Sequence, residues 1–183
     1  IPVTIAESDG GDEGEEGDAG VAMTPVVFTT KEVEQNGVRK LALTVTLTDE
    51  VANVTEVQIK LYFDKAAFDI GLADHQATSI VTSANRSVKI QPGDTDDSRK
   101  LTIGASSGGS TPFAGTGELC TFYFTILEGA KGNYNFTVVD STSTSWFNGY
   151  YSTSTATRTL IPGANIPVTI AESDGGDEGE EGD

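Results

Sequence analysis

Residues 33–50 read VEQNGVRKLALTVTLTDE, and this stretch decides the fold class. Asn36-Gly37 is the strongest short signal for a two-residue hairpin turn, because both positions tolerate a positive φ. From Leu41 to Leu47, apolar residues then alternate with small or polar ones, which is the period of a strand with one buried face. The stretch therefore predicts an antiparallel hairpin made of strands 26–35 and 38–49.

The same alternation continues along the chain. Val57, Ile59 and Leu61 alternate with polar residues, and further strands are predicted near 56–63, 77–83, 86–91, 100–105, 118–127 and 133–140. No window of ten or more residues repeats its apolar positions at helical spacing, so we expect almost no helix. With a terminal strand at 166–170, these segments predict an all-β fold: a single β-sandwich of about nine strands. The length of 183 residues suits one domain with one core.

An 18-residue segment occurs twice, at 1–18 and 166–183, and both copies read IPVTIAESDGGDEGEEGD. The copies are identical and stand 165 positions apart. A fixed period of this kind indicates units in series. Two arrangements are open: a tandem array within one polypeptide, or a polymer of subunits whose junctions contain the segment.

Each copy has two parts. The first five residues alternate between apolar and polar positions, which predicts a connector strand with one buried face, formed by Ile1, Val3 and Ile5 and by Ile166, Val168 and Ile170. Residues 6–18 and 171–183 contain Gly, Asp and Glu and should be extended, self-repelling acidic linkers. A sandwich needs one closing strand, so we predict that 166–170 closes a domain spanning 19–170. The strand 1–5 then belongs to, or is donated to, a neighbouring unit.

The formal net charge of −17 is concentrated in the two copies. They hold 14 of the 28 acidic residues, and the 147 residues between them hold 14 acids against 11 Lys and Arg. Nucleic acids and anionic membranes require clustered positive charge, and no such cluster is present. No stretch is long and apolar enough to span a bilayer. We therefore exclude nucleic acid as a partner and insertion into a membrane.

Three segments of the body resemble a known family: LALTVTL (41–47), VTEVQIKLYFDKAAFDI (54–70) and KLTIGASSGGSTPFAGTGELCTFYFTI (100–126). They are similar to the cohesin domain and to related carbohydrate-binding-module sandwiches, and the similarity extends over residues 26–170. The resemblance implies a nine-stranded jelly-roll sandwich found in large secreted, multi-modular cell-surface proteins. Cohesins bind dockerins through a sheet face, but no dockerin-contacting residue carries over onto this sequence.

The sequence offers no recognisable catalytic arrangement. His75 is the only histidine, and it lies in a predicted polar loop. Around it there is no nucleophile motif, no His-based metal motif and no phosphate-binding glycine loop. We therefore expect that the chain is not an enzyme.

Calcium is the one cofactor that the acidic segments suggest. Closely spaced carboxylates with Gly at tight turns supply the oxygen ligands that Ca²⁺ takes. The candidates are Asp9, Asp12 and Glu13, their twins Asp174, Asp177 and Glu178, and the separate turn with Asp94, Asp96 and Asp97. Their spacing does not match an EF-hand loop, so a solvated acidic linker or turn is the alternative interpretation.

Two further patterns concern glycans. Sequons at Asn53, Asn85 and Asn135 indicate a glycosylated surface protein, since each Asn is predicted in a turn or on an outward face. Aromatic residues cluster in a Ser/Thr-rich stretch at Trp146, Phe147, Tyr150 and Tyr151. Exposed aromatic planes would suit a sugar ligand, and core packing beneath a loop is the alternative.

Together these observations predict a structural repeat unit of an extracellular filament or of a cell-surface tandem-repeat protein. The sandwich would be a rigid bead, joined to the next by β-strand complementation and an acidic linker. The alternative is a cohesin-like or carbohydrate-binding module that mediates attachment. The expected partners are accordingly copies of the chain itself, or a dockerin-like protein or a glycan.

Overall fold

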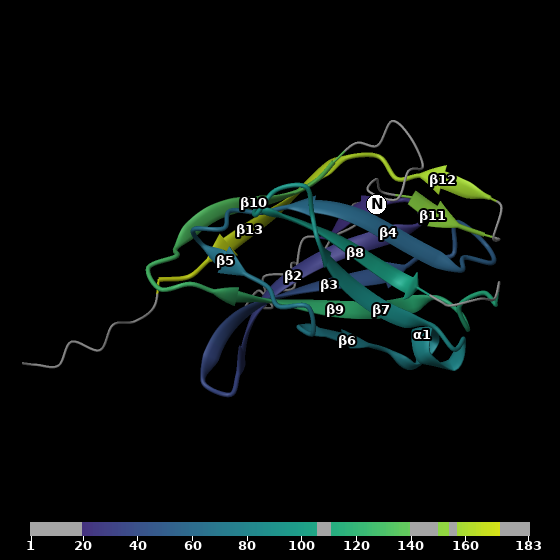
Figure 1. Ribbon diagram of the computed structural model, residues 1–183, viewed down its shortest axis with the longest axis horizontal. Coiled ribbons are helices and arrows are strands. Elements are labelled where there is room, and N and C mark those ends of the chain that lie inside the picture. Colours follow the sequence, from purple (N-terminus) through teal and green to yellow (C-terminus); the bar gives the residue numbers. More distant parts are fainter. Residues whose placement is uncertain (1–19, 106–110, 140–149, 154–156, 173–183) are drawn as a thin grey trace, which may run out of the picture.

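The computed structural model describes residues 20–105, 111–139, 150–153 and 157–172. They form two β-sheets packed face to face, with one short helix (Figure 1). This architecture confirms the predicted all-β sandwich. The described residues contain thirteen strands where about nine were predicted, because five additional pairings are only two or three residues long. The other eight strands coincide with predicted ones.

The first sheet has six strands and is built around three strands of ten residues each, which pair in the order β2, β3, β9. Three short strands extend it: β1 pairs with β2, while β5 and β6 both pair with β9. The strands are β1 (Val21–Met23), β2 (Val26–Gln35), β3 (Val38–Leu47), β9 (Gly117–Ile126), β5 (Phe68–Asp69) and β6 (His75–Ala77).

The second sheet has seven strands and is centred on β4. On one side β4 pairs with β8, which pairs with β7; on the other it pairs with β11 near its start and with β10 near its end. β12 and β13 lie outermost, beside β11 and β10. The strands are β4 (Glu56–Tyr62), β7 (Ser87–Pro92), β8 (Ser98–Ala105), β10 (Gly132–Val138), β11 (Tyr150–Ser152), β12 (Arg158–Leu160) and β13 (Ala164–Ile170).

The predicted hairpin is present. β2 and β3 pair over their whole length, from Val26 opposite Leu47 to Gln35 opposite Val38. At the tip, Asn36 and Gly37 have φ values of 54° and 76°, the left-handed conformations that a two-residue hairpin turn requires. The distal half of the hairpin extends beyond the body of the sandwich, at the lower left of Figure 1. One end of the molecule therefore carries a projecting two-stranded element.

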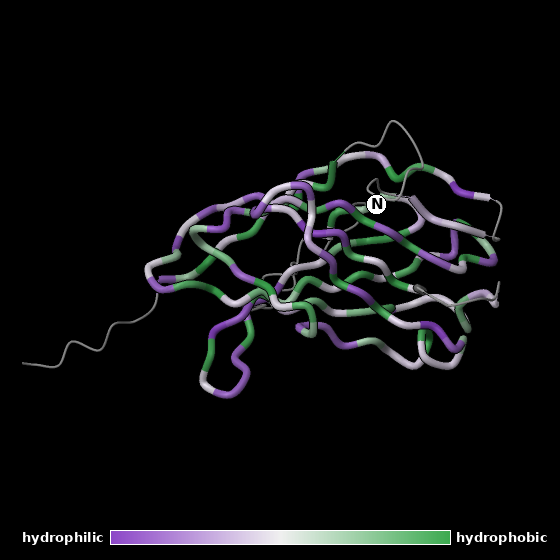
Figure 2. The backbone as a smooth tube through the Cα atoms, in the orientation of Figure 1, coloured by the Kyte–Doolittle hydropathy of each residue, from purple (hydrophilic) through white to green (hydrophobic). Residues whose placement is uncertain are grey.

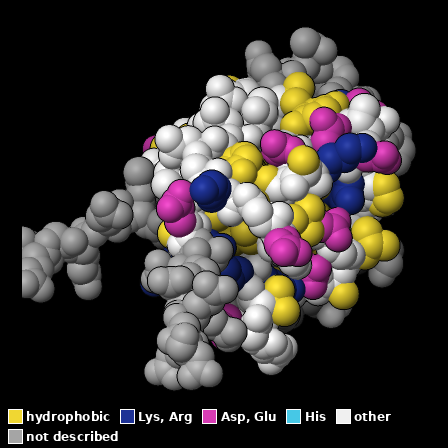
Figure 3. Space-filling model, turned by 90° about the vertical axis from the view of Figure 1, so that its left-hand side faces the viewer, with side chains coloured by type: hydrophobic (Ala, Val, Ile, Leu, Met, Phe, Trp, Pro, Cys, Tyr) yellow, Lys and Arg dark blue, Asp and Glu magenta, His cyan; other side chains and the backbone are white. Residues whose placement is uncertain are grey.

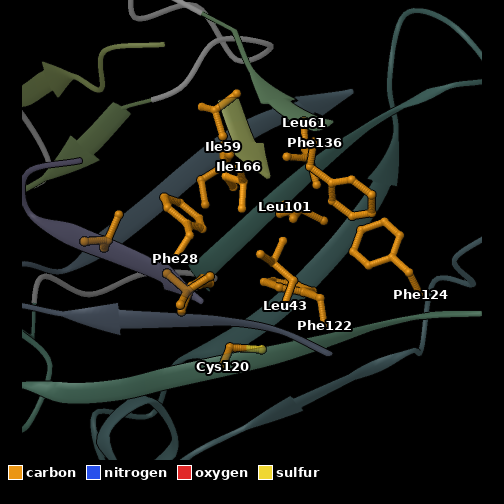
Figure 4. Packing of buried hydrophobic residues seen from close by; sticks show 14 of the residues in the cluster. Phe28, Leu43, Ile59, Leu61, Leu101, Cys120, Phe122, Phe124, Phe136 and Ile166 are labelled. Atoms are coloured by element: carbon orange, nitrogen blue, oxygen red, sulfur yellow. The ribbon is translucent and has the colours of Figure 1, made fainter. Parts of the chain in front are cut away.

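The core lies between the sheets and is formed by alternate side chains of the long strands (Figure 4). Figure 2 shows the corresponding alternation of apolar and polar stretches along the chain. Phe136 of β10 is fully buried, and its ring centroid lies 4.8 Å from that of Phe124 and 5.0 Å from that of Phe68. Because Phe124 and Phe68 belong to the opposite sheet, these edge-to-face contacts join the two layers.

The predicted strand 77–83 is wrong. Ser79–Ser83 form α1, a single helical turn that follows β6. The main-chain N–H groups of Val81 and Thr82 both donate to the carbonyl oxygen of Thr78, so local bonds replace sheet pairing. Val81 is the only buried residue of this turn. One buried side chain fits a turn as well as a strand, so the apolar pattern did not separate the two.

Cys120, the only cysteine, lies on β9 and is fully buried. Burial raises the pKa of its thiol to about 12, so the reactive thiolate is scarce near neutral pH. We expect the folded chain to react with dithionitrobenzoate about a hundredfold more slowly than the chain in concentrated guanidinium chloride. Absorbance of the released thiolate gives both rates, and equal rates would contradict this placement.

Candidate binding face and repeat junction

The second copy of the repeated segment forms most of β13. Ile166, Val168 and Ile170 point into the core and are only 1, 2 and 2 % exposed. β13 pairs with all seven residues of β10. Residues 166–170 therefore lie in the sandwich of their own chain, where they form the outermost strand beside β10. The first copy, residues 1–18, lies outside the described residues.

A polar clamp holds the chain where it leaves β13. The main-chain N–H of Ala171 donates to Glu32 Oε1 at 2.6 Å, and Arg39 Nη2 donates to the carbonyl oxygen of Ala171 at 2.8 Å. Glu32 on β2 and Arg39 on β3 also pair with each other at 2.8 Å. The next linker residue, Glu172, pairs with Lys131 at 3.0 Å. Ala171, the first residue of the acidic linker, is thus held beside the base of the projecting hairpin, and the exposed Glu172 pairs with Lys131, which precedes β10.

The clamp predicts a measurable local stabilisation. Glu32→Ala removes the acceptor of the Ala171 N–H and the partner of Arg39, and we expect a loss of about 1 kcal/mol in the free energy of unfolding. Hydrogen exchange at the Ala171 amide should accelerate at the same time. Glu34→Ala, an exposed change on the same strand, is the matched control and should leave that exchange rate unaltered. Unchanged exchange in Glu32→Ala would contradict the clamp.

The outer face of the seven-stranded sheet carries a fixed tyrosine. Tyr62 Oη donates to Asp94 Oδ1 at 2.7 Å, and Lys60 Nζ donates to Asp94 Oδ2 at 2.8 Å. Ser98 Oγ also donates to Asp94 Oδ1, at 3.0 Å. Lys60 and Tyr62 together hold the pKa of Asp94 well below its usual range, so the carboxylate stays ionised. The Lys60 ammonium lies 5.3 Å from the centroid of the Tyr62 ring and limits its movement further.

A second tyrosine on this face is held in a similar way. Tyr150 Oη donates to Glu56 Oε1 at 2.6 Å, and the Arg158 guanidinium lies 4.5 Å from the centroid of its ring. Burial, and then the bond to Glu56, raise the pKa of Tyr150, so its hydroxyl stays protonated. Both tyrosines therefore have one fixed orientation. Tyr150 is 3 % exposed, so only Tyr62 presents its ring to a partner, and it does so with little conformational entropy left to lose.

Polar side chains lie between the two tyrosines. Gln58 is opposite Thr102, and Lys60 is opposite Lys100, in the β4–β8 ladder. Gln58, Lys100 and Thr102 are only 3, 5 and 6 % exposed although they alternate with the core residues of their strands. Burial lowers the pKa of Lys100. The buried Thr102 Oγ1 has no hydrogen-bond partner among the described residues, so a group that bonded to it would relieve an unfavourable burial.

The outer face of the six-stranded sheet has a different character. Short hydroxyl side chains dominate it, and Thr44 and Thr121 hydrogen-bond to each other across β3 and β9 at 3.0 Å. Its one outward tyrosine, Tyr123, donates to Gln76 Oε1 at 3.1 Å. This face therefore consists mainly of short threonine side chains. Among the described residues, it has no tyrosine that is bonded to a carboxylate, as Tyr62 and Tyr150 are on the other sheet.

The structure describes three of the residues predicted to bind calcium. Asp94 accepts bonds from Lys60, Tyr62 and Ser98, as described above, and Asp96 pairs with Lys65 at 3.3 Å. Asp97 accepts a hydrogen bond from the hydroxyl of Thr95. Within residues 20–105, 111–139, 150–153 and 157–172, no three His, Cys, Asp or Glu side chains form a group that could hold a metal ion. Calcium binding here and in the linkers stays a prediction.

The three sequon asparagines are all exposed. Asn53 and Asn85 lie in turns with φ values of 61° and 55°, and Asn135 lies on β10. Each side chain is therefore accessible to a modifying enzyme, and glycosylation itself stays a prediction. Two members of the aromatic cluster lie outside the described residues, whereas Tyr150 is buried and Tyr151 packs against the core. These two tyrosines therefore offer no open ring to a sugar.

His75 is not in a loop, as the sequence suggested, but in β6, opposite Phe122 of β9. Its ring centroid lies 6.4 Å from that of Phe122, and burial lowers its pKa.

The described part of the chain contains no helix with the length and apolar character needed to cross a membrane.

Comparison with known proteins identifies the fold. The family model of the cohesin domain matches residues 25–159. The sixth cohesin of scaffoldin B from Acetivibrio cellulolyticus, in complex with a Cel5 dockerin variant, is 17 % identical with a TM-score of 0.57, covering 80 % of this chain and 99 % of that one. CaCohA2 from Clostridium acetobutylicum, in complex with CaDoc0917, is 16 % identical with a TM-score of 0.55, covering 72 % and 89 %. No curated protein matches the chain by sequence.

The predicted jelly-roll architecture agrees with these structures. Cohesin domains are non-catalytic binding modules, which agrees with the expectation that the chain is not an enzyme. The matched region comprises well over half of the sequence and runs from β2 into β12. The chain therefore belongs to the cohesin domain family.

Proposed function

We propose that the chain is an extracellular attachment module that binds a dockerin-like protein on the outer face of its seven-stranded sheet. Several solved relatives are cohesins in complex with dockerins. The observation that carries the choice of face is the fixation of Tyr62 by Asp94 and Lys60. Rigid tyrosines are typical anchors of protein interfaces, because they present a large contact area at a low cost in conformational entropy.

Two further features support this face. Lys89 is exposed on β7, opposite Thr102 of β8, so this part of the face would favour an acidic group of the partner. The Thr102 hydroxyl is buried in the same β4–β8–β7 region without a hydrogen-bond partner among the described residues, so side chains that rearranged there on binding would gain a bond.

The test is a binding titration of the 183-residue chain against a displayed library of dockerins that includes the Cel5 dockerin and CaDoc0917. We expect at least one dockerin to bind, and Tyr62→Ala to raise its Kd about tenfold or more. Tyr123→Ala, on the opposite face, is the matched control and should leave the Kd unchanged. Absence of binding across the library, or equal effects of both substitutions, would refute the proposal.

We also propose that such modules are joined in series within one polypeptide. β13 already fills the strip beside β10, and its own sandwich holds it at a high effective concentration. The identical strand 1–5 would then be the closing strand of the preceding unit. In that unit Ala6 and Glu7 would occupy the clamp positions that Ala171 and Glu172 occupy here.

The mass of the native protein under denaturing conditions tests whether the units are joined in series within one polypeptide. A mass of several repeats is expected, whereas a single-repeat mass would refute covalent linkage and favour strand donation between subunits.

Electron micrographs should show a fixed axial repeat if the array is a filament. If calcium binds the acidic linkers, EDTA should lengthen or loosen that repeat, and an unaltered repeat would exclude this role.

A further inference from the structure

We propose that the tip of the β2–β3 hairpin docks into an apolar pocket at the opposite end of the next copy of this chain. The inference rests on the proposed series of units and adds a specific contact between neighbours. The hairpin and the pocket are different surfaces, so the contact is head-to-tail. Contacts of this type propagate from unit to unit and give an open filament when the rotation between neighbours does not close into a ring.

The hairpin tip has the features of an inserting element. It projects from the end of the molecule seen in Figure 3, where apolar, basic and acidic side chains are interspersed (Figures 1 and 3). Val38, the first residue of β3, is 42 % exposed and is one of only two large apolar side chains that are exposed in the described part of the chain. The turn residues Asn36 and Gly37 make the tip narrow, since one has a short side chain and the other has none.

The pocket lies at the far end of the same strand. It has a volume of about 270 Å³, and its apolar lining comes from Leu47, Val51, Ala52, Val54 and Phe113. Leu47 is the last residue of β3, and Val38 is the first, so the exposed Val38 and the pocket are separated by about 30 Å along the strand. They therefore lie at opposite ends of the sandwich, as a head-to-tail contact requires.

The charges of the two surfaces are complementary. On the outward side of the hairpin, Lys31, Val33 and Val38 follow one another towards the tip, and the acidic residues Glu32 and Glu34 are on the other side. Lys40, opposite Val33, pairs with Asp74 of its own chain. The pocket mouth carries the exposed Asp49, followed in sequence by Glu50, and its lining contains no Lys or Arg. An approaching hairpin would thus lead with the apolar Val38 and bring the exposed Lys31 towards these carboxylates.

The linker is long enough for this contact. The chain leaves at the clamp beside Glu32, about 10 Å before the hairpin tip, and it enters the next unit at Gly20. A Cβ on Gly20 would lie 3.0 Å from Val27 Cγ1, so the chain enters near the start of β2, where Val26 pairs with the pocket residue Leu47. Residues 172–183 can extend over about 40 Å. This length exceeds the sum of two distances: from the clamp to the hairpin tip in one unit, and from Gly20 to the pocket in the next.

One hairpin tip in one pocket is a small interface, so between separate chains it will form only at high concentration. Within a series, the linker raises the effective concentration of the two surfaces into the millimolar range. The contact is therefore best detected by trapping it covalently between separate chains.

The test mixes full-length chains that carry Val38→Cys with chains that carry Ala52→Cys and treats them with a short bifunctional maleimide. The native Cys120 is buried and does not compete. Intact mass identifies the heterodimer. The matched control replaces Val38→Cys by Leu72→Cys, which modifies the other exposed large apolar residue, 60 % exposed. We expect the Val38–Ala52 heterodimer to form at least about tenfold faster than the control.

Equal rates in the two mixtures would overturn the docking proposal. A second measurement applies to a covalent chain of two units, whose maximum dimension in solution scattering should increase with Val38→Asp and stay unchanged with Leu72→Asp. Because cross-linking uses separate chains, its outcome is independent of the native mass. A multiple-repeat mass without preferential cross-linking would leave the series intact and remove only the docking contact.

Discussion

Replacing Val168 by Asp is expected to destabilise the folded chain by about 3–5 kcal/mol. Val168 is 2 % exposed in the middle of β13, so a carboxylate there would be buried without a partner, and the apolar contacts of the valine would be lost. A loss of this size is a large part of the total stability of an ordinary domain. Urea unfolding followed by fluorescence measures it.

The sequence provides an ideal control, because Val3 stands in the same position of the identical first copy. Val3→Asp should change the free energy of unfolding of the isolated chain by less than about 0.5 kcal/mol. When a complete unit precedes it, the same substitution should become as destabilising as Val168→Asp. Equal losses from both substitutions in the isolated chain would show that both strands stabilise one sandwich, and the series proposal would then fail.

The second large effect is expected at the contact between the sheets. Phe136→Ala should reduce the free energy of unfolding by about 3–5 kcal/mol and lower Tm by about 10 °C, because it removes a fully buried ring from the layer between β10 and β9. Calorimetry measures both quantities. The neighbouring rings of Phe63, Phe68 and Phe124 would border the cavity that remains.

Phe136→Leu is the control for this prediction. Leucine retains most of the apolar volume but not the edge-to-face geometry, so its loss should be about 1–2 kcal/mol. If Phe136→Ala cost less than about 1 kcal/mol, the ring would not be the contact between layers that the structure shows.

Local patterns predicted most of the fold correctly. Leu41 and Leu47, at the ends of the alternating run, are 1 % and 4 % exposed, and Asn36-Gly37 forms the hairpin turn. These features depend on the backbone geometry of a few adjacent residues, so the sequence reveals them without knowledge of the rest of the chain. The strand predicted at 77–83 failed because that segment has only one buried residue and therefore no period to detect.

The candidate site was less accessible to sequence reasoning. Tyr62 and Asp94 are 32 positions apart, and Glu32 and Ala171 are 139 positions apart. An alternating pattern shows that Tyr62 faces outward, but not which side chains from other strands it meets. That depends on strand order and register, which are fixed by the free energy of packing the whole core.

The sequence by itself determined three properties of this protein: the sandwich class, the hairpin turn and the existence of an exact repeat with an acidic linker. Only the tertiary structure decided where the second copy of that repeat lies, because two identical strands have identical local propensities. Seating one of them beside β10 is a property of the whole packed core, and the clamp that holds the end of β13 joins Ala171 to residues more than a hundred positions earlier, Glu32 and Arg39.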